Sequence, residues 1–319
     1  MYWIGYDGHA VSTAFITHRD CLRHDMGRGH PERPERLSAI EDQLIASGVE
    51  QFLARHDAPL ASDEQLARVH PMEYVRAIRE AAPERGTVHL DPDTAMNPHS
   101  LNAALRAAGA AVLATDLVMQ GEAASAFCSV RPPGHHACSA RPMGFCIFNN
   151  VAVAARHAMQ AHGVERVAIV DFDVHHGNGT EEIFSHDGQV LMVSTFQHPF
   201  YPYSGTEDPA SNMVNVPLAA GAGSKQFREA VTRYWIPALE RFAPQLVLFS
   251  AGFDAHAEDD MAMLRLVDSD YGWVTQEIKA IADRHAGGRV VSMLEGGYAL
   301  SALGRSVVQH LRVLAGMNA

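Results

Sequence analysis

The sequence predicts an α/β fold in which a parallel sheet carries helices on both faces. Apolar runs typical of buried strands alternate with helix-forming segments along most of the chain. Four short segments that contain His, Asp or Tyr each follow one of these apolar runs. Because the carboxyl ends of parallel strands meet at one edge of a sheet, we expect the four segments to converge on a single site.

The elements follow one another in a regular order. Residues from Ser100 onwards are rich in Ala and Leu, with Ser100 as the expected N-cap of a helix and Gly121 as its end. Further helices are expected near residues 151–162, 225–242 and 271–285, and strands near residues 125–130, 167–170, 190–195, 246–250 and 290–294. Residues 21–36, 86–99 and 198–217 contain turn formers and are interpreted as loops around a substrate channel.

Length and composition favour a single domain over residues 1–319. The chain is 47% hydrophobic, which supplies one large core, and no repeat, low-complexity tract or linker divides it. No apolar run reaches membrane-spanning length, and residues 1–7 lack the basic and apolar regions of a signal peptide. We therefore expect a soluble, cytoplasmic protein with no membrane partner.

Net charge indicates which binding partners are favoured, and cysteine content indicates the redox compartment. The net charge of −12 disfavours binding to nucleic acid and would attract cationic substrates weakly. The four cysteines, Cys21, Cys128, Cys138 and Cys146, show no C-x-x-C spacing, which fits a reducing compartment. The sequence does not determine the oligomeric state, so a homo-oligomer stays open.

Two of the four segments supply three candidate metal ligands. Asp173 and His175 follow one apolar run, and Asp254 follows another. Alternate residues of an extended backbone point the same way, so Asp173 and His175 can share one ion. One imidazole and two carboxylates with open positions are typical of a catalytic zinc, although iron and cobalt also fit. His176 points the opposite way and is interpreted as a packed, hydrogen-bonded histidine.

The other two segments supply proton-transfer groups. A rigid Pro-Pro-Gly turn precedes His135 and His136, and Asp171 and Asn178 are candidates to hold their Nδ1 protons. Tyr298 follows two glycines that let the backbone approach the metal, and its hydroxyl can stabilise an oxyanion. This set of groups predicts amide hydrolysis by metal-activated water, without a covalent intermediate.

Five motifs resemble the zinc-dependent histone deacetylase family, and the likeness spans nearly the whole chain. They are Arg131-Pro-Pro-Gly-His-His136, Gly144-Phe-Cys-Ile-Phe-Asn-Asn150, Asp171-Phe-Asp-Val-His-His-Gly-Asn-Gly179, Ser250-Ala-Gly-Phe-Asp254 and Glu295-Gly-Gly-Tyr298. The N-terminal segment Gly29-His-Pro-Glu-Arg-Pro-Glu-Arg36 resembles the class II branch and its bacterial relatives, including acetylpolyamine amidohydrolases. The resemblance implies the arginase–deacetylase fold, with one central, mostly parallel sheet of about eight strands.

The resemblance also implies a role for each matched residue. One catalytic Zn²⁺ would be bound by Asp173, His175 and Asp254. His136 would act as general base and then acid, with His135 as its electrostatic partner, Asp171 and Asn178 as their orienting residues, and Tyr298 as the group that binds the substrate carbonyl. A structural K⁺ or Na⁺ would be bound by Asp171, Asp173, His175, Ser194 and Thr195.

The remaining matches belong to the substrate channel. Phe145 and Tyr201 would form its aromatic walls, Asp93 its polar rim and Met261 its mouth, and Gly144, Gly296 and Gly297 would line it. Asn178 departs from class I relatives, which have an aspartate there, so His136 is expected to titrate at lower pH.

These residues favour a zinc amidohydrolase that removes acetyl or another acyl group from Nε-acyl-lysine in a protein or peptide. The alternative is the same chemistry on a small acetylated polyamine. Acetylpolyamine-specific relatives place an acidic residue where this chain has Met261, but the acidic residues 258–260 keep that alternative open. The His pair and Tyr298 argue against a binuclear manganese ureohydrolase. The full set of matched catalytic residues argues against an inactive acyl-lysine binding module.

Overall fold

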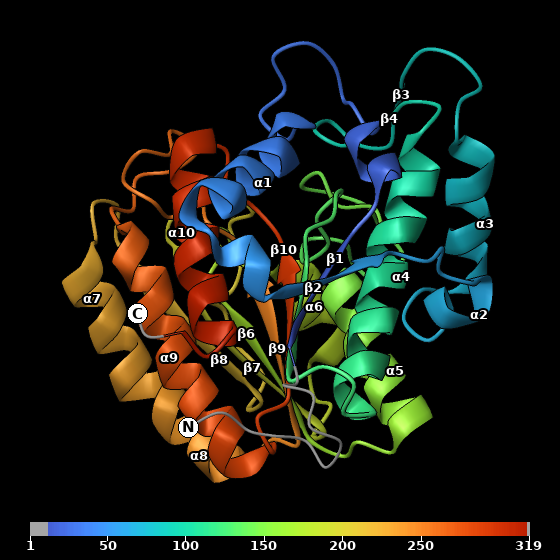
Figure 1. Cartoon of the computed structure of the whole chain (residues 1–319). Helices are drawn as coiled ribbons and strands as arrows, with labels where there is room; N and C mark the ends of the chain where they lie inside the picture. Colours follow the sequence, from blue (N-terminus) through green and yellow to red (C-terminus); the bar gives the residue numbers. More distant parts are fainter. Residues whose placement is uncertain (1–11, 318–319) are drawn as a thin grey trace.

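A parallel sheet of eight strands forms the centre of the protein (Figure 1), in agreement with the prediction from the alternating pattern. The computed structural model describes residues 12–317, so the segment used to exclude a signal peptide lies outside the described residues. The strand order is β2-β1-β5-β10-β9-β6-β7-β8, and each pair of neighbours is parallel. The strands are β1 (Thr13–Thr17), β2 (Leu53–Asp57), β5 (Ser125–Cys128), β6 (Val167–Asp171), β7 (Val190–Gln197), β8 (Met213–Leu218), β9 (Leu246–Ala251) and β10 (Val290–Leu294). A short antiparallel pair, β3 (Val88–His89) and β4 (Ala95–Met96), forms a separate sheet.

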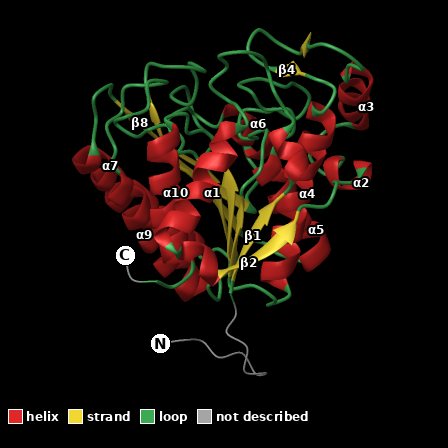
Figure 2. Ribbon diagram, turned by 45° about the horizontal axis from the view of Figure 1, so that its top comes forward, coloured by secondary structure: helices red, strands yellow, loops and turns green. Residues whose placement is uncertain are grey.

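Helices cover both faces of the sheet (Figures 1 and 2). On one face α4 (Ser100–Met119) packs on α5 (Asn150–His162), with α2 (Asp63–Leu66) and α3 (Met72–Ala81) beside them. On the other face α10 (Leu300–Leu314) packs between α1 (Glu35–Ser47) and α9 (Asp268–His285). The remaining helices are α6 (Asn178–Phe184), α7 (Ser224–Ala230) and α8 (Ile236–Phe242), the 3-10 turns η1 (Arg19–Leu22) and η2 (Val49–Phe52), and a π-helical turn, η3 (Val231–Trp235), between α7 and α8.

The central strands are buried on both faces, which explains why they appear in the sequence as continuous apolar runs. Several expectations from the sequence were wrong in detail. The expected loop 86–99 contains β3 and β4, and the expected loop 21–36 overlaps the start of α1. Residues 213–217, interpreted as loop, belong to β8, an edge strand that is buried only at its first and last residues. Ser100 is the first residue of α4 rather than its N-cap, which is His99, and its hydroxyl oxygen accepts a hydrogen bond from the backbone N–H of Asn97.

Helix α4 corrects the expectation that no segment is long and apolar enough to cross a membrane. By length and composition alone it passes that test, but 72% of its apolar window is buried inside the protein. It packs so closely that a side chain at Gly109 would collide with the backbone of Pro59 and Ala61. Its apolar character therefore has a sufficient explanation in core packing.

Candidate active site

The four predicted segments converge at the carboxyl edge of four adjacent strands, β5, β10, β9 and β6. His135 and His136 follow β5, Asp173 and His175 follow β6, Asp254 follows β9, and Tyr298 follows β10. Five of these six residues are at least nine-tenths buried, and the sixth, Tyr298, is half-buried. The sheet topology thus brings residues that are up to 163 positions apart in the chain, from 135 to 298, to one site.

Asp173, His175 and Asp254 form a compact cluster of metal-type ligands. One ligand atom from each lies within 4.8 Å of the others. The Nδ1 atom of His175 is 3.0 Å from Oδ1 of Asp173 and 3.3 Å from Oδ2 of Asp254. Backbone N–H groups of His175 and Gly296 donate to the carboxylate of Asp173, at 2.9 Å each. These bonds fix the orientation of the carboxylate.

Two observations show that this cluster fits a metal ion. Oδ2 of Asp254 is buried, and no hydrogen-bond donor satisfies it among residues 12–317. A Cβ at Gly252 or Gly296 would collide with the carboxylates of Asp173 and Asp254, so glycine is needed for the close approach of the backbone. One imidazole nitrogen and two carboxylate oxygens with space at the pocket end match the donor set of an open, catalytic site.

The two adjacent histidines have different partners. Nδ1 of His135 lies 3.0 Å from Oδ2 of Asp171, and Nδ1 of His136 lies 2.8 Å from Oδ1 of Asn178. The amide nitrogen of Asn178 faces the sulfur of Met143 at 3.3 Å, so its oxygen is the atom that accepts from His136. His136 therefore carries its proton on Nδ1 and presents Nε2 as an acceptor at the pocket wall.

The surroundings of His135 and His136 shift the pKa values of the two rings in opposite directions. Burial lowers the pKa of His135, but the carboxylates of Asp173 and Asp171 outweigh it and raise that pKa well above the ordinary value. Burial, together with the charge of neighbouring His135, lowers the pKa of His136 well below the ordinary value. One ring therefore holds a proton while the other stays neutral, as expected for adjacent imidazoles with unlike partners.

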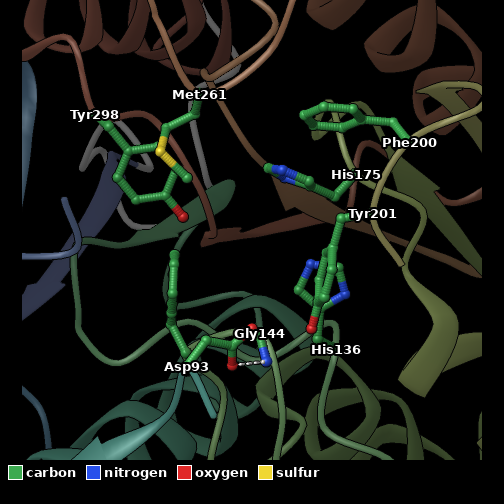
Figure 3. Close-up of a pocket in the computed structure, with 9 residues that line it drawn as sticks. Asp93, His136, Gly144, His175, Phe200, Tyr201, Met261 and Tyr298 are labelled. Atoms are coloured by element: carbon green, nitrogen blue, oxygen red, sulfur yellow. Dashed lines mark hydrogen bonds between the residues drawn. The ribbon is translucent and has the colours of Figure 1, made fainter. Parts of the chain in front are cut away.

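A pocket of about 200 Å³ opens above these residues (Figure 3). Its lining residues are Asp93, His136, Gly144, Phe145, His175, Phe200, Tyr201, Met261 and Tyr298. The Tyr201 ring stands edge-on to His136, with ring centroids 5.3 Å apart, and the Phe145 ring stands edge-on to Tyr298 at 6.0 Å. The hydroxyl of Tyr298 points into the space between these walls (Figure 3).

Phe200 is a pocket residue that the sequence analysis missed. It stacks on His175 with ring centroids 5.7 Å apart, whereas the sequence pattern had suggested only Tyr201 for this wall. The motif Phe200-Tyr201-Pro202-Tyr203 offered three aromatic candidates, and only the folded loop distinguishes them: Phe200 and Tyr201 line the pocket while Tyr203 is 75% exposed.

Asp93 is hydrogen-bonded to the segment that forms one wall of the channel. Its Oδ1 accepts hydrogen bonds from the backbone N–H of Gly144 and from the hydroxyl of Thr94, both at 3.0 Å. The Thr94 hydroxyl oxygen accepts in turn from the backbone N–H of Phe145. Phe145 has a φ of 68°, a conformation costly for a bulky residue, so these bonds hold the aromatic wall in place.

The other predicted residues lie nearby. Gly296 and Gly297 form the turn before Tyr298, and neither lines the pocket itself. Of the predicted monovalent-cation residues, Ser194 is paired in register with Asp171 across β6 and β7, and Thr195 follows it in β7. The Ser194 hydroxyl donates to Oδ1 of Asn215 at 3.0 Å. His176 points away from the pocket to Glu181 and Ser204, as predicted.

A second cluster of metal-type residues, Asp116, His157 and His162, lies between α4 and α5. Nε2 of each histidine is 2.7 Å from Oδ1 of Asp116, and the Arg68 guanidinium donates to Nδ1 of His157. Because an arginine can only donate, His157 must accept at Nδ1 and carry its proton on Nε2. The cluster is therefore explained as a hydrogen-bonded network that joins the two helices.

Comparisons with known proteins show which family the chain belongs to. The model of the histone deacetylase domain matches residues 30–314. The chain belongs to the histone deacetylase family. A histone deacetylase-like amidohydrolase from Pseudomonas aeruginosa is 43% identical over 277 residues, covering 85% of this chain and 73% of that protein. A probable deacetylase from Archaeoglobus fulgidus is 36% identical, covering 96% of this chain and 86% of that protein.

Structure comparison leads to the same family. The HD domain of HDA15, solved by crystallography, superposes with a TM-score of 0.89 at 35% identity, over 96% of this chain and 90% of that domain. A human protein named polyamine deacetylase HDAC10 is 36% identical over 96% of this chain, which spans 48% of that protein. The histone deacetylase family comprises metal-dependent hydrolases, and this member has deacetylase, or amidohydrolase, activity on acetylated substrates.

Proposed function

We propose that this protein is a zinc-dependent deacetylase of Nε-acetyl-lysine side chains. The observation that carries the proposal is the convergence of Asp173, His175 and Asp254 with His136 and Tyr298 around one narrow, aromatic-walled pocket. Aromatic walls suit the methylene chain of lysine, and the pocket lies beside both a metal-type ligand set and proton-transfer groups.

Zinc would be held by Asp173, His175 and Asp254, where it would supply Lewis-acid polarisation of the substrate carbonyl and activation of water. His136 is the general base, because its Nε2 faces the pocket unprotonated. Nε2 takes a proton from the attacking water and then gives it to the departing lysine amine as the amide C–N bond breaks. The products are acetate and the free amine.

Tyr298 and His135 act on charge in the transition state. The Tyr298 hydroxyl donates a hydrogen bond to the carbonyl oxygen as that oxygen becomes negative. Its pKa is raised well above the ordinary value, chiefly by burial, so the phenol keeps the proton that it donates. His135, oriented by Asp171, adds positive charge beside the reacting centre. Asn178 orients His136 without adding a negative charge.

We also propose a structural K⁺ or Na⁺ held by Asp171, Ser194 and Thr195 with the backbone of Asp173 and His175. The register of β6 with β7 supports this assignment. We propose that the chain acts as one catalytic domain, because strands from residue 13 to residue 294 form a single sheet. A cytoplasmic location is also proposed, on the basis of the sequence alone.

Acetyl-lysine is favoured over acetylated polyamines by the charges around the mouth. Met261 is neutral where an acidic residue would meet a remote ammonium group. Of the acidic residues 258–260, Glu258 is paired with Arg305 at 2.7 Å and Asp259 is buried, which leaves Asp260 exposed. The polyamine alternative rests on the likeness to the human polyamine deacetylase and predicts a strong preference for small amines.

Replacement of Tyr298 by Phe tests the mechanism. It removes the hydroxyl and keeps the ring, so kcat on an acetyl-lysine peptide is expected to fall by about 10²- to 10³-fold while bound zinc stays at one ion per chain. Elemental analysis and steady-state kinetics measure the two quantities. Tyr203→Phe, an equal change on an exposed ring, is the control. Undiminished turnover in Tyr298→Phe would contradict the mechanism.

A further inference from the structure

The loop after Asp254 contains an acidic residue that is unexpectedly buried. Asp259 is only 5% exposed, although its neighbours Glu258 and Asp260 are exposed. A carboxylate removed from water is costly unless it is hydrogen-bonded or paired. Asp259 meets this requirement with backbone amides: Oδ2 accepts from Tyr298 at 2.6 Å and Ala299 at 3.0 Å, and Oδ1 accepts from Met261 at 3.1 Å.

The backbone that Asp259 holds contains residues with few conformational restrictions of their own. Two glycines precede Tyr298, and Gly297 has a φ of 122°, a region that side chains exclude. Arg36 contacts the same segment. Its Nε donates to the Gly297 carbonyl at 2.7 Å, and its guanidinium lies 4.9 Å from the centroid of the Tyr298 ring. A buried cation and a buried anion therefore both contact the segment that carries Tyr298.

The same carboxylate reaches the channel mouth. Met261 and Tyr298 both line the pocket (Figure 3), although they come from different loops. Asp259 is the hydrogen-bonded link between these two loops, because each of its oxygens binds one of them. Displacement of its carboxylate would move the phenol that faces the substrate carbonyl and the thioether at the mouth together.

We propose that Asp259 is a positioning residue that fixes the Tyr298 hydroxyl against the substrate carbonyl and couples it to Met261 at the mouth. The inference rests on the proposed function, in which Tyr298 binds that carbonyl. Asp259 itself faces backbone amides and takes no part in proton transfer.

Asp259→Asn tests the assignment, since it keeps the size of the side chain but turns one acceptor into a donor that faces backbone N–H groups. Misplacement of a catalytic group by about 1 Å costs about 100-fold in rate, so kcat is expected to fall by about 10- to 100-fold with zinc content retained. In a Tyr298→Phe background the same substitution should change kcat by less than about twofold, because the hydroxyl that it positions is already absent.

Asp260→Asn is the matched control, because it removes an equal charge from an exposed neighbour and should leave kcat unchanged. An Asp259→Asn effect of equal size in both backgrounds would overturn the proposal, as would full activity of Asp259→Asn alone. A Tyr298→Phe protein with wild-type activity would instead contradict the proposed role of Tyr298.

A second measurement does not depend on the folding of a variant. In the wild-type protein, the amides of Tyr298 and Ala299 should exchange with deuterium slowly, because Asp259 accepts from both. Exchange at the rate of an unprotected loop would overturn the proposal. Asp259→Glu keeps the charge with one added methylene, and it is expected to lose less activity than Asp259→Asn; a larger loss would also count against the assignment.

Discussion

At the scale of single residues, the hydrogen-bond partners of His135 and His136 determine which of the two rings is neutral. Asp171 places a carboxylate on Nδ1 of His135, whereas Asn178 places a neutral amide on Nδ1 of His136. The pKa of His136 is lowered well below its ordinary value by burial and by the charges of His135 and His175. His136, the proposed general base, is therefore expected to stay neutral at low pH.

Asn178→Asp should therefore shift the acidic limb of the kcat/KM profile to higher pH. A carboxylate on Nδ1 favours the imidazolium, so the pKa of His136 rises and the neutral base is lost at a higher pH than in the wild-type protein. Asn102→Asp, on the exposed side of α4, adds the same charge far from the site and controls for the total charge. A limb that stays in place or moves to lower pH would show that His136 is not the base.

The site residues were predictable where a motif fixed them locally. His135, His136, Asp173 and His175 lie in short motifs directly after apolar runs, so their convergence followed from the topology of a parallel sheet. Contacts between distant loops were not predictable. The bonds from Asp259 to Tyr298 and from Asp93 to Gly144 join segments with no sequence pattern in common.

At the scale of elements, predictability followed burial. Strands β6, β9 and β10 are buried on both faces and carry unbroken apolar runs. Strand β2, Leu53-Ala-Arg-His-Asp57, lies at a sheet edge and is half polar, so its sequence resembles a loop. Strand β8, at the other edge, contains Pro217, which also weakens the strand pattern.

Helix α4 offers a test of packing against helix propensity. Gly109→Ala improves propensity but drives a methyl group into the backbone of Pro59 and Ala61, so we expect a loss of about 1–3 kcal/mol in the free energy of unfolding. Gly272→Ala in α9 is the matched control, because its methyl would meet Gln309 at an ordinary 3.4 Å, and it should be neutral or stabilising by up to about 1 kcal/mol. Urea denaturation measures both variants, and equal effects would contradict the packing described for α4.

At the scale of the whole molecule, a buried histidine couples stability to pH. His310 on α10 is fully buried among Phe127, Phe172 and Phe249, and burial lowers its pKa to about 3. Its ring nitrogens contact the hydroxyls of Thr275 and Ser292 at 2.6 and 2.9 Å. The unfolded chain binds a proton at this residue below about pH 6.5, and the folded protein does so only near pH 3.

As pH falls from about 6.5 to 3, the unfolded state gains a proton at His310 that the folded state does not gain. The free energy of unfolding therefore decreases over this range. Between pH 6.5 and 5 the contribution of His310 is on the order of 2 kcal/mol. His310→Gln should lower stability at pH 7 but lose correspondingly less between pH 6.5 and 5. Urea titrations of both proteins at several pH values measure this difference, and parallel pH dependences would contradict a neutral, buried His310.

The eight-stranded sheet, the buried ligand cluster and the narrow channel together support one central claim, that this chain deacetylates acetyl-lysine. The most direct test compares kcat/KM of the zinc-loaded enzyme on an acetyl-lysine peptide with kcat/KM on acetylputrescine and acetylspermidine. We predict a strong preference for the peptide, because Met261 is neutral at the mouth. A strong preference for the acetylated amines would contradict the claim and make the enzyme a polyamine deacetylase.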